Sequence, residues 1–136
     1  SIGISASGLE AESIRMQVAA NNIANADTTA ADAGSVFRRK EVIFSERLDR
    51  ALGNHRPADS LRGVEIKGIV TDTRDPMRIY KPGHPHADSD GYVYKANVSS
   101  VEEMVNMMSA TRAYEANLAA IKAAKRMASQ ALQLGK

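Results

Sequence analysis

The chain has 136 residues, with 18 Lys and Arg against 16 Asp and Glu, no Cys, no Trp and 4% aromatic residues. This length favours a single domain, and a net charge of +2 gives no strong attraction to nucleic acid or anionic membranes. The lack of Cys excludes disulfides, thiolate catalysis and Cys-based metal sites. No segment has the ~18 apolar residues of a transmembrane helix, and the first four residues lack the features of a cleaved signal peptide. We therefore expect a chain that does not span a membrane and has no cleaved signal at this start.

Alanine is unevenly distributed along the chain. Of 22 Ala, 9 lie in residues 1–33 and 10 in residues 96–136, whereas all four Pro and both Phe lie between them. Ala favours helices, Pro ends them, and aromatic residues favour strands. The sequence therefore predicts an α+β fold, with a discontinuous helical coiled-coil domain (1–33 and 96–136) and a small β-rich insert (34–95).

The N-terminal helix is predicted from about Ser7 to Asn25, roughly 28 Å long at 1.5 Å per residue. Ser7 and Glu10 match a capping box. Small and apolar residues recur at steps of four and three, at Ile2, Ala6, Leu9, Ser13, Met16, Ala20 and Ile23. This spacing predicts a seam that packs against another helix.

Three asparagines, Asn21, Asn22 and Asn25, lie at the end of this predicted helix. Asn is a poor helix former, so its presence requires an explanation. One hypothesis is that these residues cap a fraying helix end. The other is that their amides, which both donate and accept, fix the register of a helix interface.

The middle of the chain alternates strand and turn patterns. Residues 27–35 read as a polar loop, 36–44 as a strand, 45–62 as a charged loop, and 64–70 as a strand with a bulge or kink at Gly68. Residues 77–80 and 92–94 are shorter strand candidates, joined by turns at 81–85 and 88–91. A sheet of four such strands is marginal alone, so we expect it to pack on the helices or on other subunits.

The C-terminal helix is predicted from about Ser99 to Leu134, a length of roughly 54 Å. Ser99 with Glu102 and Ser100 with Glu103 both match a capping box, and Gly135 follows the last helical residue. The N-terminal helix is long enough to cover only about half of this helix. The remainder must find another partner or stay in solvent.

Two apolar stripes follow the C-terminal helix. One runs in steps of three and four through Met104, Met107, Thr111, Tyr114, Leu118, Ile121, Lys125, Ala128 and Leu132. It forms a heptad seam with a polar interruption at Lys125. The other, Val101, Val105 and Met108, lies on a different face, so the helix should have more than one neighbour. We interpret the Met-rich stripe as packing and predict no cofactor.

Other motifs do not indicate a metal site or an active site. Asp88-x-Asp90-Gly91 resembles part of a calcium loop, but a carboxylate is missing at its last position, Asn97, so we favour a turn. His84 and His86 flank a Pro far from His55, which is typical of a solvated loop. Because the sequence also lacks nucleophile and phosphate-loop motifs, we expect no metal and no enzyme.

The basic run Arg38-Arg39-Lys40 supports a hypothesis from another class, a small nucleic-acid or adaptor-binding module. Alternation along a strand would place these charges on both faces, and no aromatic platform accompanies them. We therefore expect no nucleic-acid partner.

Longer motifs carry a family resemblance. They are Ile4-Ser5-Ala6-Ser7-Gly8-Leu9, residues 20–28 (Ala-Asn-Asn-Ile-Ala-Asn-Ala-Asp-Thr), Asn97-Val98 with residues 101–105, and residues 109–117 (Ser-Ala-Thr-Arg-Ala-Tyr-Glu-Ala-Asn). Together they resemble the terminal signatures of the bacterial flagellar rod and hook family. Residues 37–44, 82–85 and 88–93 resemble its short proximal-rod members, and the resemblance covers essentially the whole chain.

This resemblance implies a structural subunit of the flagellar basal body. Family members pass through the flagellar type III export apparatus without a cleaved signal and assemble in the periplasm with other rod proteins and copies of themselves. The rod transmits motor torque to the hook, and the paired terminal helices line the inner part of the tube. Another short axial protein of the family is the alternative. The expected assembly interface comprises Leu9, Met16, Asn21, Asn22, Ile23, Asn25, Met104, Met107, Met108, Tyr114, Asn117, Leu118 and Ile121.

Overall fold

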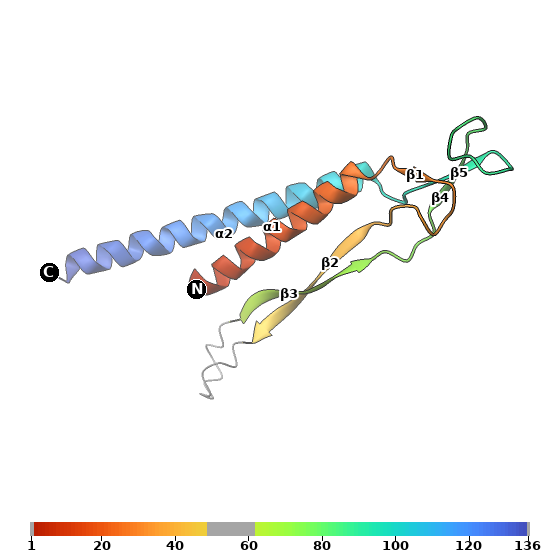
Figure 1. The fold of residues 1–136 in the computed structure, drawn as a ribbon. Helices are drawn as coiled ribbons and strands as arrows, with labels where there is room; N and C mark the ends of the chain where they lie inside the picture. The colour runs from red at the N-terminus through yellow and green to blue at the C-terminus, as the bar shows by residue number, and fades with distance from the viewer. Residues whose placement is uncertain (1, 49–61, 136) are drawn as a thin grey trace.

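Two helices of unequal length lie side by side, with strands beside and beyond them (Figure 1). The computed structural model describes residues 2–48 and 62–135. Its elements are α1 (Ile2–Ala24), β1 (Thr29–Ala30), β2 (Lys40–Leu48), β3 (Arg62–Thr71), β4 (Met77–Tyr80), β5 (Tyr92–Lys95) and α2 (Ser100–Leu134). The predicted α+β class, with terminal helices and a β-rich insert, is confirmed.

Helix α2 has the predicted bounds because both of its ends are capped. The Ser99 hydroxyl accepts a hydrogen bond from the Glu102 amide at 3.3 Å, and the Gly135 amide donates to the Ala131 carbonyl at 3.2 Å. Helix α1 differs from its prediction, since it begins at Ile2 and not near Ser7. The capping box at Ser7 was wrong, because its hydroxyl donates to the Ile4 carbonyl one turn earlier, inside the helix.

The two helices run antiparallel and approach each other closely. Gly8 lies against Asn117, where an added Cβ would come within 2.8 Å of the side-chain amide nitrogen. Farther along, the Thr111 hydroxyl donates to the Met16 sulfur at 3.3 Å. Ala11, Ala19 and Ala110 are buried, so small side chains occupy the centre of the helix contact.

This close packing corrects the predicted seam. Ala6 and Ala20 are exposed, and Met104 is 54% exposed. At these positions the predicted seam lies to one side of the true contact, which is centred on the small side chains of Ala11, Ala19 and Ala110.

The C-terminal part of α2 extends past the start of α1 (Figure 1). α2 has 35 residues and α1 has 23, about 52 and 34 Å at 1.5 Å per residue. Every residue from Lys125 to Leu134 is exposed. We call residues 125–134 the α2 overhang.

The strands form two sheets and not the single four-stranded sheet that the sequence suggested. One has the order β1-β5-β4, and the other is the antiparallel hairpin β2-β3, which runs beside the helices (Figure 1). The hairpin register shifts where Ile43 faces Gly68 and Phe44 faces Ile66, so the bulge predicted at Gly68 is confirmed.

Strand bounds near these sheets also differ from the prediction. β1 lies inside the predicted loop 27–35, and β2 begins at Lys40 and not at Val36, continuing to Leu48. β1 is a strand only because its two residues pair with β5. A two-residue strand has no sequence pattern that would predict it. Most of the predicted loop 45–62, together with His55, lies outside the described residues.

A small core joins the end of α1 to the three-stranded sheet. It contains Ala26, Ala30, Val36, Ala96 and Val98, with Phe37 and Tyr94 packed against it. This core and the hairpin hold the start of α2 next to the end of α1, which positions the polar cluster described next.

Candidate functional site

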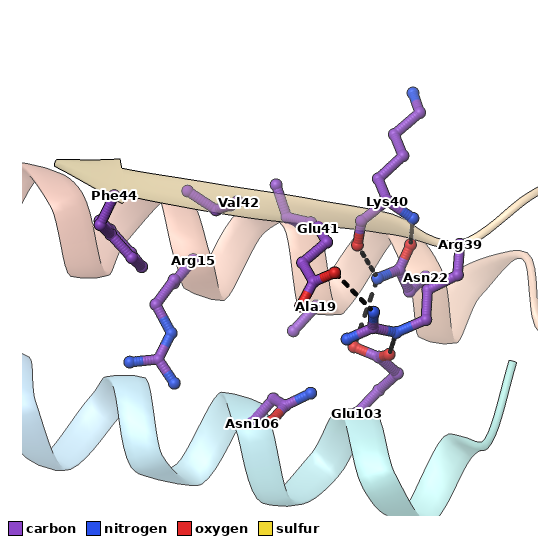
Figure 2. A pocket seen from close by; sticks show the side chains of 11 residues that line it. Arg15, Ala19, Asn22, Arg39, Lys40, Glu41, Val42, Phe44, Glu103 and Asn106 are labelled. Carbon is purple, nitrogen blue, oxygen red and sulfur yellow. Dashed lines mark hydrogen bonds and ion pairs between the residues drawn. The ribbon is translucent and has the colours of Figure 1, made fainter. Parts of the chain in front are cut away.

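Two polar side chains are fully buried among the described residues, Asn22 of α1 and Glu103 of α2. The Asn22 amide donates to the Lys40 carbonyl at 2.9 Å and to Glu103 Oε2 at 3.3 Å, and its oxygen accepts from the Lys40 amide at 2.9 Å. Figure 2 shows these bonds between the two helices and β2. The Asn22 side chain therefore bonds to the backbone of Lys40 as a neighbouring strand would, at the start of β2.

Arg39 completes this cluster from the residue before β2. Its Nε donates to Glu103 Oε1, and its Nη1 lies 3.8 Å from Glu41 and 4.0 Å from Asp72. Burial, the largest single influence, would lower the pKa of Arg39, but the hydrogen bond to Glu103 together with the negative charges of Glu103, Glu41 and Glu102 outweighs it and raises that pKa above its ordinary value. We call Asn22, Arg39 and Glu103 the polar lock.

The polar lock joins segments far apart in the chain. Asn22 and Glu103 are 81 residues apart, and Arg39 and Glu103 are 64 apart. Beside the lock is a groove of about 230 Å³, which Arg15, Val18, Phe44 and Asn106 help to line. The Glu103 carboxylate is paired with the Arg39 guanidinium, and the Asn22 amide group both donates and accepts hydrogen bonds. The cluster is therefore suited to holding β2 against both helices.

The three basic residues 38–40 do not form one patch. Arg39 points inward to Glu103, the Arg38 guanidinium donates to the Arg74 carbonyl at 3.0 Å, and Lys40 is exposed. The Arg38 and Arg39 side chains therefore hold parts of the fold together, while the Lys40 side chain is exposed.

The Asp88 carboxylate is bound by backbone amides of its own turn. Asp88 Oδ1 accepts from the amides of Asp90 and Tyr92, both at 2.9 Å, and these bonds with Arg78 lower the pKa of Asp88. Gly91 has φ +85°, in the left-handed region that favours glycine. The predicted turn at 88–91 is confirmed.

His84 and His86 also bond locally. The Thr29 hydroxyl and His86 Nδ1 are 2.8 Å apart, and His84 Nδ1 accepts from the His86 amide. Within residues 2–48 and 62–135, no group of three or more His, Asp or Glu side chains is placed to hold a metal ion. Neither helix of this part of the chain is long and apolar enough to cross a membrane.

The expected interface residues fall into three groups. Asn22 is buried inside the chain, whereas Asn21, Met104 and Met108 are exposed. The rest are half-buried: Leu9, Met16, Ile23, Asn25, Met107, Tyr114, Asn117, Leu118 and Ile121. Both hypotheses for the asparagines are partly right: one residue connects separate elements, and another bonds at the helix end. Asn22 bridges elements, while the Asn25 side chain donates to the Asn21 carbonyl at the helix end.

An exposed apolar stripe lies on the side of α2 away from α1. Val101, Met104, Val105 and Met108 are 54–73% exposed and follow helical spacing. The overhang adds Met127, Leu132 and Leu134, each at least 64% exposed. Large apolar side chains exposed along a helix indicate contact with another molecule.

Sequence reasoning missed Glu103, Arg39 and Gly8. The sequence pattern assigns Glu103 to a capping box with Ser100, and nothing in one sequence pairs it with Arg39. Gly8 did carry a signal, since glycine inside a helix costs about 1 kcal/mol relative to Ala and so indicates close backbone approach.

Comparison with known proteins shows which family this chain resembles. Residues 2–31 match the family model described as flagella basal body rod protein, and residues 89–134 match flagellar basal body rod FlgEFG protein C-terminal. These matches cover α1 and α2. The flagellar basal-body rod protein FlgC of Salmonella typhimurium is 39% identical over 132 residues, which cover 97% of this chain and 93% of the relative.

The chain belongs to the FlgC family of flagellar basal-body rod proteins. FlgC of Bacillus subtilis is also 39% identical, covering all of this chain and 97% of the relative. FlgC of Borreliella burgdorferi is 37% identical, covering 98% and 95%. The resemblance to the rod and hook family is confirmed, and the similarity to these FlgC proteins extends over the middle segments. As a member of this family, the chain is a structural component of the flagellar basal body.

Proposed function

We propose that this chain is a structural subunit of the proximal rod, held in place by contacts of its helices with copies of itself and with other rod proteins. The exposed overhang and the exposed stripe of α2 carry this proposal. In a single chain they would leave many apolar side chains in water. Heterologous contacts through such surfaces do not close and generate helical assemblies.

In this proposal, the parts of the interface have different roles. Met104, Met108 and Asn21 contact neighbouring subunits, because they are exposed. Leu118 and Ile121 hold the helix pair together and present their free edges to neighbours. Asn22 acts indirectly by keeping the hairpin on the helices. The helical domain (1–33 and 96–136) forms the inner wall of the tube, and the insert (34–95) lies farther out.

The proposed location is the periplasmic rod, reached through the flagellar type III export apparatus. A chain without Cys suits this route, since it can enter an oxidising compartment without forming disulfides. Once assembled, the rod transmits torque from motor to hook. The polar lock supports this role, because directional hydrogen bonds resist sliding of β2 along the helices.

A gene deletion tests the proposal. We expect the deletion strain not to swim and its isolated basal bodies to lack a complete rod. The gene for this chain supplied in trans should restore both, and the chain should be found in the purified basal bodies. Normal swimming by the deletion strain, or absence of the chain from wild-type basal bodies, would contradict the proposal. A salt-dependent shift of a labelled oligonucleotide would instead favour the nucleic-acid hypothesis.

A further inference from the structure

A second groove lies between the first half of α1 and strand β3. It encloses about 330 Å³ and is lined by Ser7, Glu10, Ala11, Ile14, Val64, Glu65 and Ile66. The Val64 amide donates to the Ser7 hydroxyl at 3.2 Å, which ties the strand to the helix there. We call this the α1-β3 groove.

Apolar and acidic side chains together line the groove. Ala11, Ile14, Val64 and Ile66 supply the apolar side chains, and the two titratable residues of its lining, Glu10 and Glu65, are both exposed acids. A fitting partner would carry small or aliphatic side chains beside a cation.

The α2 overhang has this pattern. After Glu115 the chain has no Asp or Glu, but it has Lys122, Lys125, Arg126 and Lys136. Lys125, Ala128 and Leu132 follow steps of three and four, so they share one helix face. Lys125, which looked like an interruption of the seam, is therefore the cation at one end of a small apolar face.

The overhang cannot occupy the groove of its own chain. Asn117 lies opposite Gly8, and Lys125 is eight residues farther along α2, about 12 Å away at 1.5 Å per residue. That displacement is directed past the start of α1, away from Glu10. An occupant of this groove must come from another molecule.

We propose that the α2 overhang of a second copy of this chain docks in the α1-β3 groove. Lys125 lies between Glu10 and Glu65, and Ala128 and Leu132 cover the apolar residues of the groove. The overhang and the groove are different surfaces, so each copy can receive one neighbour and dock on another, and the contact propagates without closing. This inference rests on the proposed function and names the surfaces that join copies in the rod.

Cysteine pairs test the contact directly, because the natural chain has no Cys. Glu10→Cys combined with Lys125→Cys, in the flagellated strain, should give disulfide-linked ladders of 14.6 kDa steps in oxidised basal bodies. A disulfide requires Cα atoms within about 7 Å, so a bond within one chain is excluded. Glu10→Cys with Arg126→Cys is the matched control, since adjacent helical residues point about 100° apart; it should give no ladder.

Charge reversal is the second test and does not depend on disulfide formation. Lys125→Glu should abolish swimming, and adding Glu10→Lys and Glu65→Lys should restore it, whereas Arg126→Glu should leave swimming intact. Basal bodies that contain the paired-Cys chain without ladders, or equal effects of Lys125→Glu and Arg126→Glu, would overturn the docking proposal alone. Absence of the natural chain from basal bodies would instead count against the proposed function.

Discussion

The Arg39 guanidinium donates a hydrogen bond to the buried carboxylate of Glu103, 64 residues away. Through this bond the residue before β2 is fixed to the first turns of α2, and Asn22 of α1 bonds to the same carboxylate. The polar lock thereby couples the hairpin to both helices.

Glu103→Gln should destabilise the purified chain strongly. The substitution leaves Arg39 with only the more distant carboxylates of Glu41 and Asp72, and breaking a buried ion pair typically costs about 3 kcal/mol or more. Urea unfolding followed by circular dichroism measures this loss. Glu102→Gln is the control, because Glu102 is exposed and its backbone amide makes the capping bond; its effect should stay within about 0.5 kcal/mol. Equal losses in the two variants would show that the pair contributes nothing specific.

Asn22→Ala should detach the start of β2. The amide and the carbonyl of Lys40 lose their bonds to Asn22, and a lost hydrogen bond typically costs about 1 kcal/mol. Fewer complete basal bodies are expected in the strain, together with a lower free energy of unfolding of the purified chain. Asn21→Ala, at an exposed position, should change neither. If Asn22→Ala left both unchanged, the hypothesis that the asparagines only cap the helix would be preferred.

Gly8→Val should push the helices apart. A Cβ there would meet the Asn117 side chain at 2.8 Å, and overpacking of this kind costs about 1–3 kcal/mol. Thermal unfolding measures the loss. Gly3→Val is the matched control, because no atom lies within 4 Å of a Cβ at Gly3. Asn117→Ala added to Gly8→Val should recover part of the stability, and failure to do so would exclude the clash as the cause.

The turn at 88–91 should weaken in acid. The bonds from the Tyr92 and Asp90 amides and from Arg78 lower the pKa of Asp88 in the folded chain. Its contribution to stability is therefore complete above the unfolded pKa of about 4 and is lost as the pH falls through the lower, folded value. A carboxyl NMR titration should give a midpoint for Asp88 below 3.8, the ordinary value. A midpoint above that value would contradict the hydrogen bonding described here.

Leu118→Asp should prevent rod assembly. Leu118 is half-buried on α2, and a charge there is incompatible with close packing of helices. We expect no swimming, while the β-rich insert keeps its fold, as judged by NMR of the purified chain. Ile121→Asp should behave alike, and Leu118→Met, which conserves volume, should swim. Normal swimming by either Asp variant would refute the predicted seam at these positions.

The sequence predicted well those features that depend on neighbouring residues. α2 was placed within one residue because Ser99 and Gly135 cap it and no Gly or Pro interrupts it. The bulge at Gly68 and the turn at Asp88 were likewise local. The start of α1 was misplaced because Ser7 satisfies a capping pattern but uses its hydroxyl inside the helix.

Features that depend on distant residues could not be predicted. The sequence pattern pairs Glu103 with Ser100 in a capping box, whereas the fold brings Arg39, 64 residues away, to its carboxylate. The true centre of the helix contact, with Gly8 and Ala110 buried, has few large apolar residues, so counting such residues placed Met104 in the seam although it is exposed. At this contact the two helix backbones lie close together, so large side chains are not needed to fill the space between them.

Electron cryomicroscopy of basal bodies from the flagellated strain is the most direct test of the central claim, that this chain is a rod subunit assembled through its helices. The account predicts density for this chain in the proximal rod, with α1 and α2 antiparallel and residues 125–134 of each copy packed on a neighbouring subunit. Basal bodies with a complete rod but without this chain would contradict the account.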